Sequence, residues 1–209
     1  MKKKLLINYW DNYYNNITNI EESSFARFVK KRIKKNSELI DIGCGNGRDS
    51  FFFSRNNLNV TAIDISKNAI KKNSIKKRKN LKFQRFDTSK DILNKKFDVF
   101  YCRFFIHAIS KEAEEKLIFL IKRNKKKNSL AFFEFRNHKD EIFNGKNKKN
   151  HNDIVEFEKG HFRRIIKPNE FINTFKNKIK SKVIYNKSSK NLSIVNKDNP
   201  NLSRIIFKF

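Results

Sequence analysis

Three of the five glycines in this 209-residue chain, Gly43, Gly45 and Gly47, fall within five positions. They follow the apolar run 38–43, which predicts a buried strand, and they precede 48–57, which predicts a helix. Glycine has no Cβ, so it permits a sharp turn and lets a ligand approach the main chain. The first amides of the helix favour an anionic or polar ligand group. The cluster predicts a ligand-binding bend between a strand and a helix; the alternative is a tight structural turn.

The remaining chain alternates apolar runs with helical patterns. Further strands are predicted over 59–64, 81–87, 97–102, 129–135, 182–185 and 203–209, and helices over 67–78, 111–126 and from Pro168 onward. Strands joined by crossover helices predict a parallel sheet. We therefore expect a doubly wound, mostly parallel seven-stranded α/β sheet in a single domain, 1–209.

Two segments lie outside this alternation. Residues 1–36 predict one or two amphipathic helices, with Phe25, Phe28, Val29 and Ile33 at helical spacing, and we expect them to form a helical lid. Residues 137–160 show little periodicity, and a long irregular segment inside a compact domain is typical of a functional loop. We expect 137–165 to be a loop insertion that covers the substrate.

Charge raises the question of nucleic-acid binding. Lysine and arginine total 49 against 21 acidic residues, a formal charge of +28, and basic surfaces release counterions from phosphates. The excess is mostly lysine, spread along the chain among many Asn, Ile and Phe residues, which the codon bias of an AT-rich genome also explains. No pattern of a known nucleic-acid reader module is present. Nucleic-acid binding is therefore an alternative and not the favoured interpretation.

The compartment follows from what the sequence lacks. The apolar run near the start stops at Asn8, too short for a signal peptide, and no stretch approaches 18 apolar residues. Cys44 and Cys102 offer neither a disulfide framework nor metal-ligand spacing. We expect a cytoplasmic protein, monomer or homodimer, with no membrane span and no metal site.

The glycine spacing selects a kind of ligand. Asp64 ends the strand after the bend, where a carboxylate can accept two ribose hydroxyls. A dinucleotide-binding fingerprint would place its third glycine at Arg48, whereas the spacing here is G-x-G-x-G. Residues 41–50, Asp-Ile-Gly-Cys-Gly-Asn-Gly-Arg-Asp-Ser, resemble the first motif of class I S-adenosylmethionine-dependent methyltransferases. The aromatic segment 9–14 resembles the N-terminal lid of the tellurite- and thiopurine-type branch.

That resemblance implies a Rossmann-like fold, S-adenosyl-L-methionine as methyl donor, S-adenosyl-L-homocysteine as product, and a set of donor-binding residues. Asp64 matches the ribose ligand, Asp87 the acid beside the adenine amine, and Cys102 the region where donor and acceptor meet. The residues expected to bind the donor are Trp10, Tyr14, Asp41, Gly43, Cys44, Gly45, Gly47, Arg48, Asp64, Ile65, Asp87, Thr88 and Cys102.

Acceptor binding is predicted from residues that follow the fourth and fifth strands. His107 is the candidate general base, because its ordinary pKa is near neutral; the alternative is a hydrogen-bonded histidine that orients its loop. Arg103 is predicted to act beside it. Arginine binds carboxylates and phosphates bidentately, so a clamp of four arginines would hold an anion, unless each forms a surface salt bridge instead. The residues expected to bind the acceptor are Arg103, His107, Arg136, His161, Arg163 and Arg164.

The leading hypothesis is an O- or N-methyltransferase that acts on a small anionic acceptor. That acceptor would be a phosphorylated, phosphonate or carboxylate metabolite, or a precursor in polysaccharide biosynthesis such as a surface glycan of the capsule. The alternative is an RNA or protein methyltransferase that exploits the positive charge. A non-catalytic donor-binding subunit is the third possibility, and the intact glycine cluster with Asp64 argues against it.

Overall fold

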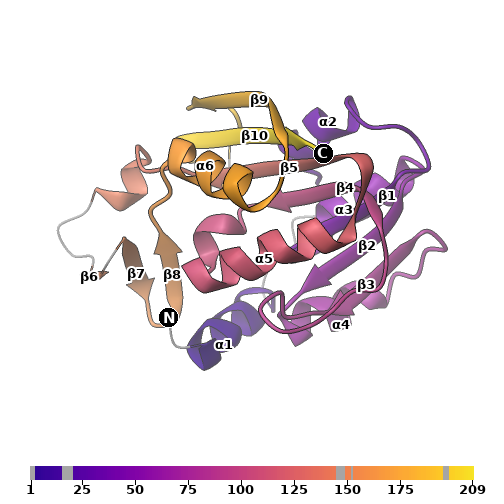
Figure 1. Ribbon diagram of the computed structural model, residues 1–209. Helices are drawn as coiled ribbons and strands as arrows, with labels where there is room; N and C mark the ends of the chain where they lie inside the picture. Colours follow the sequence, from indigo (N-terminus) through magenta and orange to yellow (C-terminus); the bar gives the residue numbers. More distant parts are fainter. Residues whose placement is uncertain (1–2, 16–20, 145–148, 152, 195–197) are drawn as a thin grey trace.

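A computed structural model describes residues 3–15, 21–144, 149–151, 153–194 and 198–209. Its main feature is a seven-stranded sheet of order β3-β2-β1-β4-β5-β10-β9 (Figure 1). Strands β1 to β5 pair in parallel, and β10 pairs antiparallel with both β5 and β9. The predicted doubly wound, mostly parallel seven-stranded sheet is confirmed. The strands are β1 (Glu38–Ile42), β2 (Asn59–Asp64), β3 (Leu81–Arg85), β4 (Phe97–Arg103), β5 (Lys125–Arg136), β9 (Lys182–Ser189) and β10 (Leu202–Lys208).

Helices cover both faces of the sheet, and serine caps fix where three of them begin. The hydroxyls of Ser23, Ser66 and Ser110 accept hydrogen bonds from main-chain amides three residues on, at 3.0–3.2 Å, which satisfies otherwise unpaired donors. The helices are α1 (Lys3–Tyr13), α2 (Ser24–Lys30), α3 (Arg48–Arg55), α4 (Lys67–Ser74), α5 (Lys111–Asn124) and α6 (Pro168–Lys178), with 3₁₀ turns η1 (Ile106–Ala108) and η2 (Glu141–Phe143). None of these described helices is long and apolar enough to cross a bilayer.

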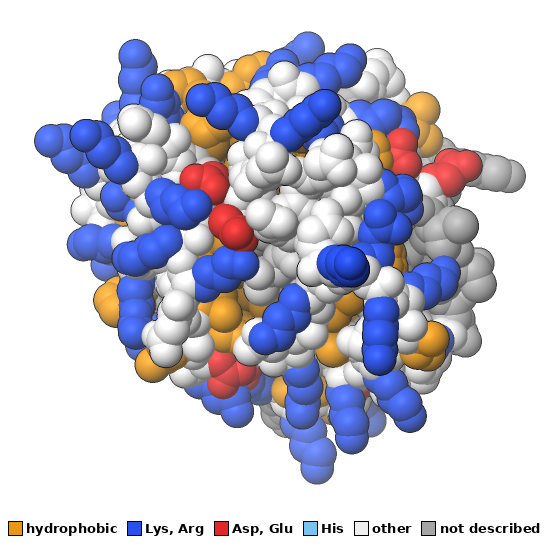
Figure 2. Space-filling view, turned by 90° about the vertical axis from the view of Figure 1, so that its right-hand side faces the viewer, with side chains coloured by type: hydrophobic (Ala, Val, Ile, Leu, Met, Phe, Trp, Pro, Cys, Tyr) orange, Lys and Arg blue, Asp and Glu red, His pale blue; other side chains and the backbone are white. Residues whose placement is uncertain are grey.

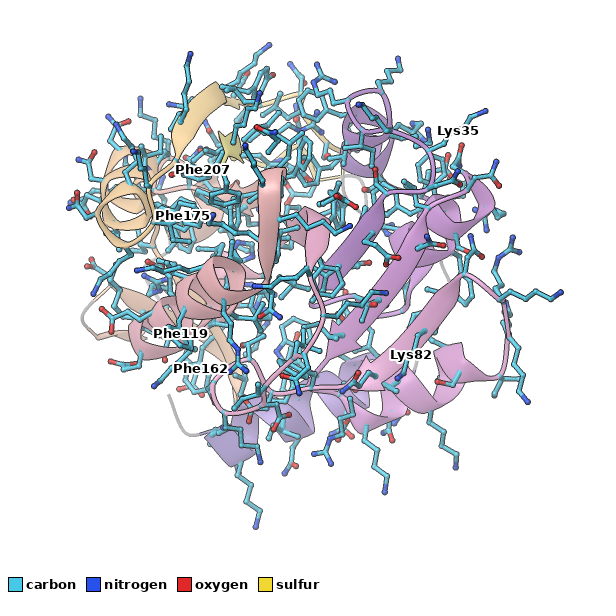
Figure 3. All side chains as sticks on the ribbon, turned by 45° about the vertical axis from the view of Figure 1, so that its right-hand side comes forward. Lys35, Lys82, Phe119, Phe162, Phe175 and Phe207 are labelled. Atoms are coloured by element: carbon cyan, nitrogen blue, oxygen red, sulfur yellow. The ribbon has the colours of Figure 1, made fainter. Side chains whose placement is uncertain are left out.

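Phenylalanine supplies much of the core on either side of the sheet. On one face α5 and α6 pack against β4, β5 and β10, and Phe175 stacks on Phe207 with ring centroids 4.0 Å apart (Figure 3). On the other face α2 and α3 contribute Phe25 and Phe53. A large ring buries much apolar area per residue, so the sheet is well covered although the chain is only 38% hydrophobic.

Residues 137–165 do not form the irregular loop that the sequence predicted. They contain η2 and a three-stranded antiparallel sheet of β6 (Lys149–His151), β7 (Ile154–Glu158) and β8 (His161–Arg164). Gly160, at φ +87°, makes the turn between β7 and β8, and Val155 is buried within β7. The many Lys and Asn residues before Asp153 hid the short alternating run 154–158. Residues 145–148 and 152 of this segment lie outside the described residues.

The N-terminal segment is helical where it is described. Helix α1 lies against α4 and β8, at the lower edge of Figure 1, and α2 packs on the sheet. Helix α2 ends before Ile33, and α4 ends at Ser74, four residues short of its predicted limit. Residues 1–2 and 16–20 of the expected lid are not among the described residues.

Candidate active site

A cavity of about 630 Å³ lies at the carboxyl ends of β1, β2 and β4, beneath α1. That is where an α/β sheet of this kind binds ligands, and the volume is within the usual range for small-molecule sites. Of the thirteen residues expected to bind the donor, eleven line it: Trp10, Tyr14, Asp41, Gly43, Cys44, Gly45, Arg48, Asp64, Ile65, Asp87 and Thr88.

The two remaining residues lie outside the cavity wall. Gly47 is the N-cap of α3 with φ +73°, and a Cβ there would meet the Asn73 amide and the Phe83 ring, each at 2.9 Å. Cys102 is buried in the apolar core between the sheet and α5. Gly47 therefore supports the bend from the side away from the cavity. The prediction that Cys102 binds the donor is not supported, because its side chain points to the opposite side of β4 from that of Tyr101, which lines the cavity.

The glycine bend is held rigidly by its neighbours. Gly43 and Cys44 donate main-chain hydrogen bonds to the carbonyl of Ile63 at 2.9 and 3.0 Å, and the Asn73 amide donates to the carbonyl of Gly45 at 2.8 Å. Gly43 and Gly45 have positive φ values of 75° and 53°, which a side chain strongly disfavours.

Two aromatic rings lie directly against this bend. A Cβ on Gly43 would be 2.5 Å from the Phe105 ring, and one on Gly45 would be 2.4 Å from the Tyr14 hydroxyl. Both rings also line the cavity. The main chain of the bend is therefore in direct contact with these rings, and a side chain at Gly43 or Gly45 would prevent the contact.

Asp64 connects the end of β2 to the bend. One carboxylate oxygen accepts the Gly45 amide at 2.9 Å, and the other accepts the Ser66 amide at 2.8 Å. Burial raises the pKa of Asp64, and these backbone hydrogen bonds oppose the rise. Because a carboxylate offers about four lone-pair positions, Asp64 keeps acceptor capacity for ligand hydroxyls.

Two further carboxyl groups form the floor of the cavity. Asp41 accepts the Ser50 hydroxyl at 2.5 Å, and burial raises its pKa to about 8. Asp49 accepts the Ser23 amide at 2.7 Å and the Tyr101 hydroxyl at 2.6 Å. Asp49 and Tyr101 were not predicted from the sequence as site residues. The position of Asp49 in the first turn after the glycine bend was the available signal.

Arg103 is fixed at one side of the cavity by a buried ion network. Its guanidinium donates to Glu134 at 3.0 Å, and Glu134 also accepts from Arg204 at 2.7 Å. Burial opposes the charged form of Arg103, but the Glu134 carboxylate outweighs it, and the pKa of Arg103 is raised. The guanidinium lies 4.2 Å from the ring centre of Phe104, which has an unusual φ of +53°. Strained backbone of this kind occurs often at functional sites.

His107 does not line the cavity. It is 2% exposed, and its Nδ1 accepts the main-chain amide of Arg136 at 3.2 Å. Burial and the nearby Arg163 and Arg136 lower its pKa well below 6.5. This placement fits the loop-orienting alternative and does not support a general base in contact with a bound acceptor.

The four-arginine clamp is not assembled. Arg136 pairs with Asp140 at 2.8 Å and with Asp198, and Arg164 pairs with Glu114. Neither of these arginines lines the cavity. Each instead forms salt bridges, which is the alternative that the sequence left open.

Arg163 is the exception among the arginines after the fifth strand. It lines the cavity, its guanidinium lies 5.1 Å from the centre of the Trp10 ring, and burial lowers its pKa to about 10. No described carboxylate lies within 4.0 Å of it. A cation enclosed without a counter-ion is costly, so this position favours an anionic ligand group.

Helix α1 forms one wall of the cavity. Lys3 pairs with Asp87 at 2.5 Å and donates to Ser89 at 2.8 Å. Partial burial opposes the charged form of Asp87, but the hydrogen bonds that it accepts from Lys3 and Ser89 outweigh burial and lower its pKa. Further along α1, Asp11 accepts the Ser66 hydroxyl at 2.7 Å. The helix is therefore tied to the ends of β2 and β3.

The same helix packs on the β7–β8 hairpin. Tyr9 stacks on His161 with ring centroids 4.6 Å apart, and a Cβ on Gly160 would lie 2.7 Å from the carbonyl of Leu5. His161 faces these aromatic rings and not the cavity; burial and Arg163 lower its pKa to about 3. Helix α1 and the hairpin thus cover the cavity as one packed unit that includes Trp10 and Arg163.

Residues 40–131 match a family model described as a methyltransferase domain. No curated protein sequence is a significant match.

Solved structures share the fold across nearly the whole chain. The PH0226 protein from Pyrococcus horikoshii has a TM-score of 0.74 at 16% identity and covers 94% of this chain and 98% of its own. The glycopeptide N-methyltransferase MtfA, complexed with sinefungin, has a TM-score of 0.70 at 12% identity over 93% and 89%. A TehB-like S-adenosylmethionine-dependent methyltransferase from Corynebacterium glutamicum has a TM-score of 0.64 at 15% identity over 96% and 94%. Residues 40–131 are thus similar to a methyltransferase domain, and the chain as a whole shares the seven-stranded fold of these solved structures.

Proposed function

We propose that the chain is an S-adenosyl-L-methionine-dependent methyltransferase that acts on a small anionic acceptor, at oxygen or nitrogen. The observation that carries the donor assignment is the cavity in which the glycine bend, Asp64 and Asp87 meet. The family match and the donor complexes of similar folds support it. When bound, the donor supplies an electrophilic methyl group on a sulfonium.

The cavity residues suit each part of such a donor. Asp64 would accept the ribose hydroxyls and Asp87 the adenine amine. The carboxylate of Asp49 on the floor would favour the positive charge of the donor. Flat rings of Tyr14 and Phe105 against the bend would exclude water from the reacting centre. Holding two reactants in line can supply roughly 7–11 kcal/mol of a barrier, so positioning is the main task of these residues.

Arg163 supports the anionic character of the acceptor. It is a cavity-lining guanidinium without a described carboxylate partner, and Arg103 presents a second, although it is bound to Glu134. A phosphate, phosphonate or carboxylate on the acceptor would complete the coordination of Arg163. A precursor of a surface glycan with such a group belongs to the same chemical class.

Transfer of a radiolabelled methyl group into a fractionated cell lysate tests the proposal. We expect label in the small-molecule fraction that an anion exchanger retains, and at least tenfold less with Arg163→Met than with wild type. Arg55→Met, at a half-exposed arginine outside the cavity, is the matched control. Label in the RNA or protein fraction would replace the small acceptor with a macromolecule, and equal labelling by Arg163→Met would remove this residue from acceptor binding.

A further inference from the structure

The two edges of the main sheet carry opposite charge. The described segments at the edge where β1 to β5 and β9 begin, and where β10 ends, contain fifteen lysines and arginines and no acidic residue. These segments are 31–37, 56–58, 75–80, 92–96, 125–128, 179–181 and 208–209.

The opposite edge, which holds the cavity, differs sharply. Its described segments contain three lysines and five acidic residues, and three arginines, Arg85, Arg103 and Arg136, end the strands beside them. These segments are 43–47, 65–66, 86–91, 104–110, 137–144, 190–194 and 198–201. Codon bias raises the lysine content of a whole chain without regard to the fold. It therefore does not account for a difference between two edges that only the fold creates.

The basic edge is displayed to solvent. Figure 2 shows a face dominated by Lys and Arg side chains, and the side chain of Lys35 projects outward in Figure 3. The densest groups are 31–35 and 76–79, each with four exposed cations. The few nearby carboxylates are already paired: Glu38 with Lys95 at 2.6 Å and Asp98 with Lys126 at 2.8 Å. Most of the positive charge on this edge thus has no carboxylate partner among the described residues.

The dimensions of the edge match a nucleic-acid backbone. Seven strands spaced by about 4.8 Å span roughly 29 Å, and duplex DNA carries one phosphate charge per about 1.7 Å of axis. A duplex along the edge would therefore present about 8 base pairs to it. Among the exposed large apolar side chains, Ile75 and Ile92 belong to these segments. Two isolated isoleucines among many cations fit phosphate contact better than insertion into a lipid layer.

We propose that this edge, from the segment 75–80 before β3 to the segment 179–181 before β9, is a docking surface for the phosphate backbone of nucleic acid. The bound nucleic acid is not the methyl acceptor. Strand β4 has seven residues and spans about 20 Å, so a phosphate at its start lies about that far from the cavity floor. The surface tethers the enzyme to a polyanion while the cavity stays open to a small acceptor.

The test is fluorescence anisotropy with a labelled 20-base-pair DNA duplex, titrated with protein between 50 and 200 mM NaCl. One variant changes Lys34, Lys35, Lys77 and Lys79 to Glu on the basic edge. The matched control changes Lys67, Lys90, Lys139 and Lys159 to Glu, which are exposed away from that edge. Both variants have the same net charge. Wild type should bind with a steep salt dependence, about 0.9 in log–log slope per phosphate contact.

We expect the edge variant to lose at least tenfold in affinity and the control to stay within threefold of wild type. Equal weakening by both variants would mean that net charge alone governs binding, and would overturn the proposal. So would retention by phosphatidylserine vesicles with no duplex binding. Binding of S-adenosyl-L-methionine, measured by calorimetry in wild type and the edge variant, should be the same, so failure of the docking proposal is distinguishable from failure of the proposed function.

Discussion

Glu134 is the buried carboxylate on which the acceptor side of the cavity depends. It is fully buried, it pairs with Arg103 and Arg204, and it accepts the Ser193 hydroxyl at 3.1 Å. Glu134→Gln keeps the size of the side chain but leaves two enclosed guanidiniums without their shared counter-charge. Removing one partner of a buried ion pair typically costs about 3–5 kcal/mol, a large fraction of the ~5–15 kcal/mol that stabilises most domains.

Urea unfolding followed by circular dichroism measures this cost, and thermal melting should show a decrease of roughly 6–20 °C for a chain of this size. Glu115→Gln is the matched control: this carboxylate is half exposed and contacts Lys178 at 3.7 Å, so its loss should cost at most about 1 kcal/mol. A change below 1 kcal/mol for Glu134→Gln would refute the view that its charge holds Arg103 and Arg204 in place.

Three further variants test individual groups of the site. Burial raises the pKa of Asp41 from 3.8 to about 8, so between these pH values the folded protein holds a proton that the unfolded chain releases. The stability of the fold therefore falls as pH rises from about 4 to about 8. Asp41→Asn should flatten the dependence of the melting temperature on pH in this range, and an unchanged slope would contradict the assignment. Burial and neighbouring arginines lower the pKa of His107 below 6.5, so the stability of the fold decreases as pH drops below 6.5. Between pH 7.5 and 5 the melting temperature of His107→Gln should decrease less than that of wild type, and turnover should be largely retained. Lys3 is half exposed, and its pair with Asp87, which must open for Asp87 to bind the donor, contributes at most about 1 kcal/mol. Lys3→Met should therefore tighten donor binding by up to about fivefold in calorimetry, relative to the control Lys4→Met. Weaker binding would show that Lys3 assists the donor.

The sequence predicted the part of the site that is local in the chain. The bend at Gly43, Gly45 and Gly47 and the carboxylate of Asp64 depend on strand and helix boundaries, which apolar periodicity reveals. The doubly wound, mostly parallel character of the sheet followed from the alternation of strands and helices, because crossover helices join strands that lie parallel in one sheet.

The acceptor side depends on partners that are distant in sequence. Position at a strand end predicted that Arg136 lies at the cavity edge of the sheet. It could not predict that Asp198, 62 residues away, would bind its guanidinium. Likewise Arg164 is held by Glu114, 50 residues away. The burial of His107 arises from the packing of β8 on η1, which required the hairpin that the sequence analysis took for a loop.

Calorimetric titration of S-adenosyl-L-methionine into wild type and Asp64→Asn tests the central claim most directly, with Asp98→Asn as a control for a carboxylate at the far edge of the sheet. Hydrogen bonds to a charged group contribute about 1.5–3 kcal/mol each. Wild type and Asp98→Asn should therefore bind the donor alike, and Asp64→Asn should bind at least tenfold more weakly. Absence of binding to wild type, or equal affinity in Asp64→Asn, would contradict the assignment of this cavity to the methyl donor.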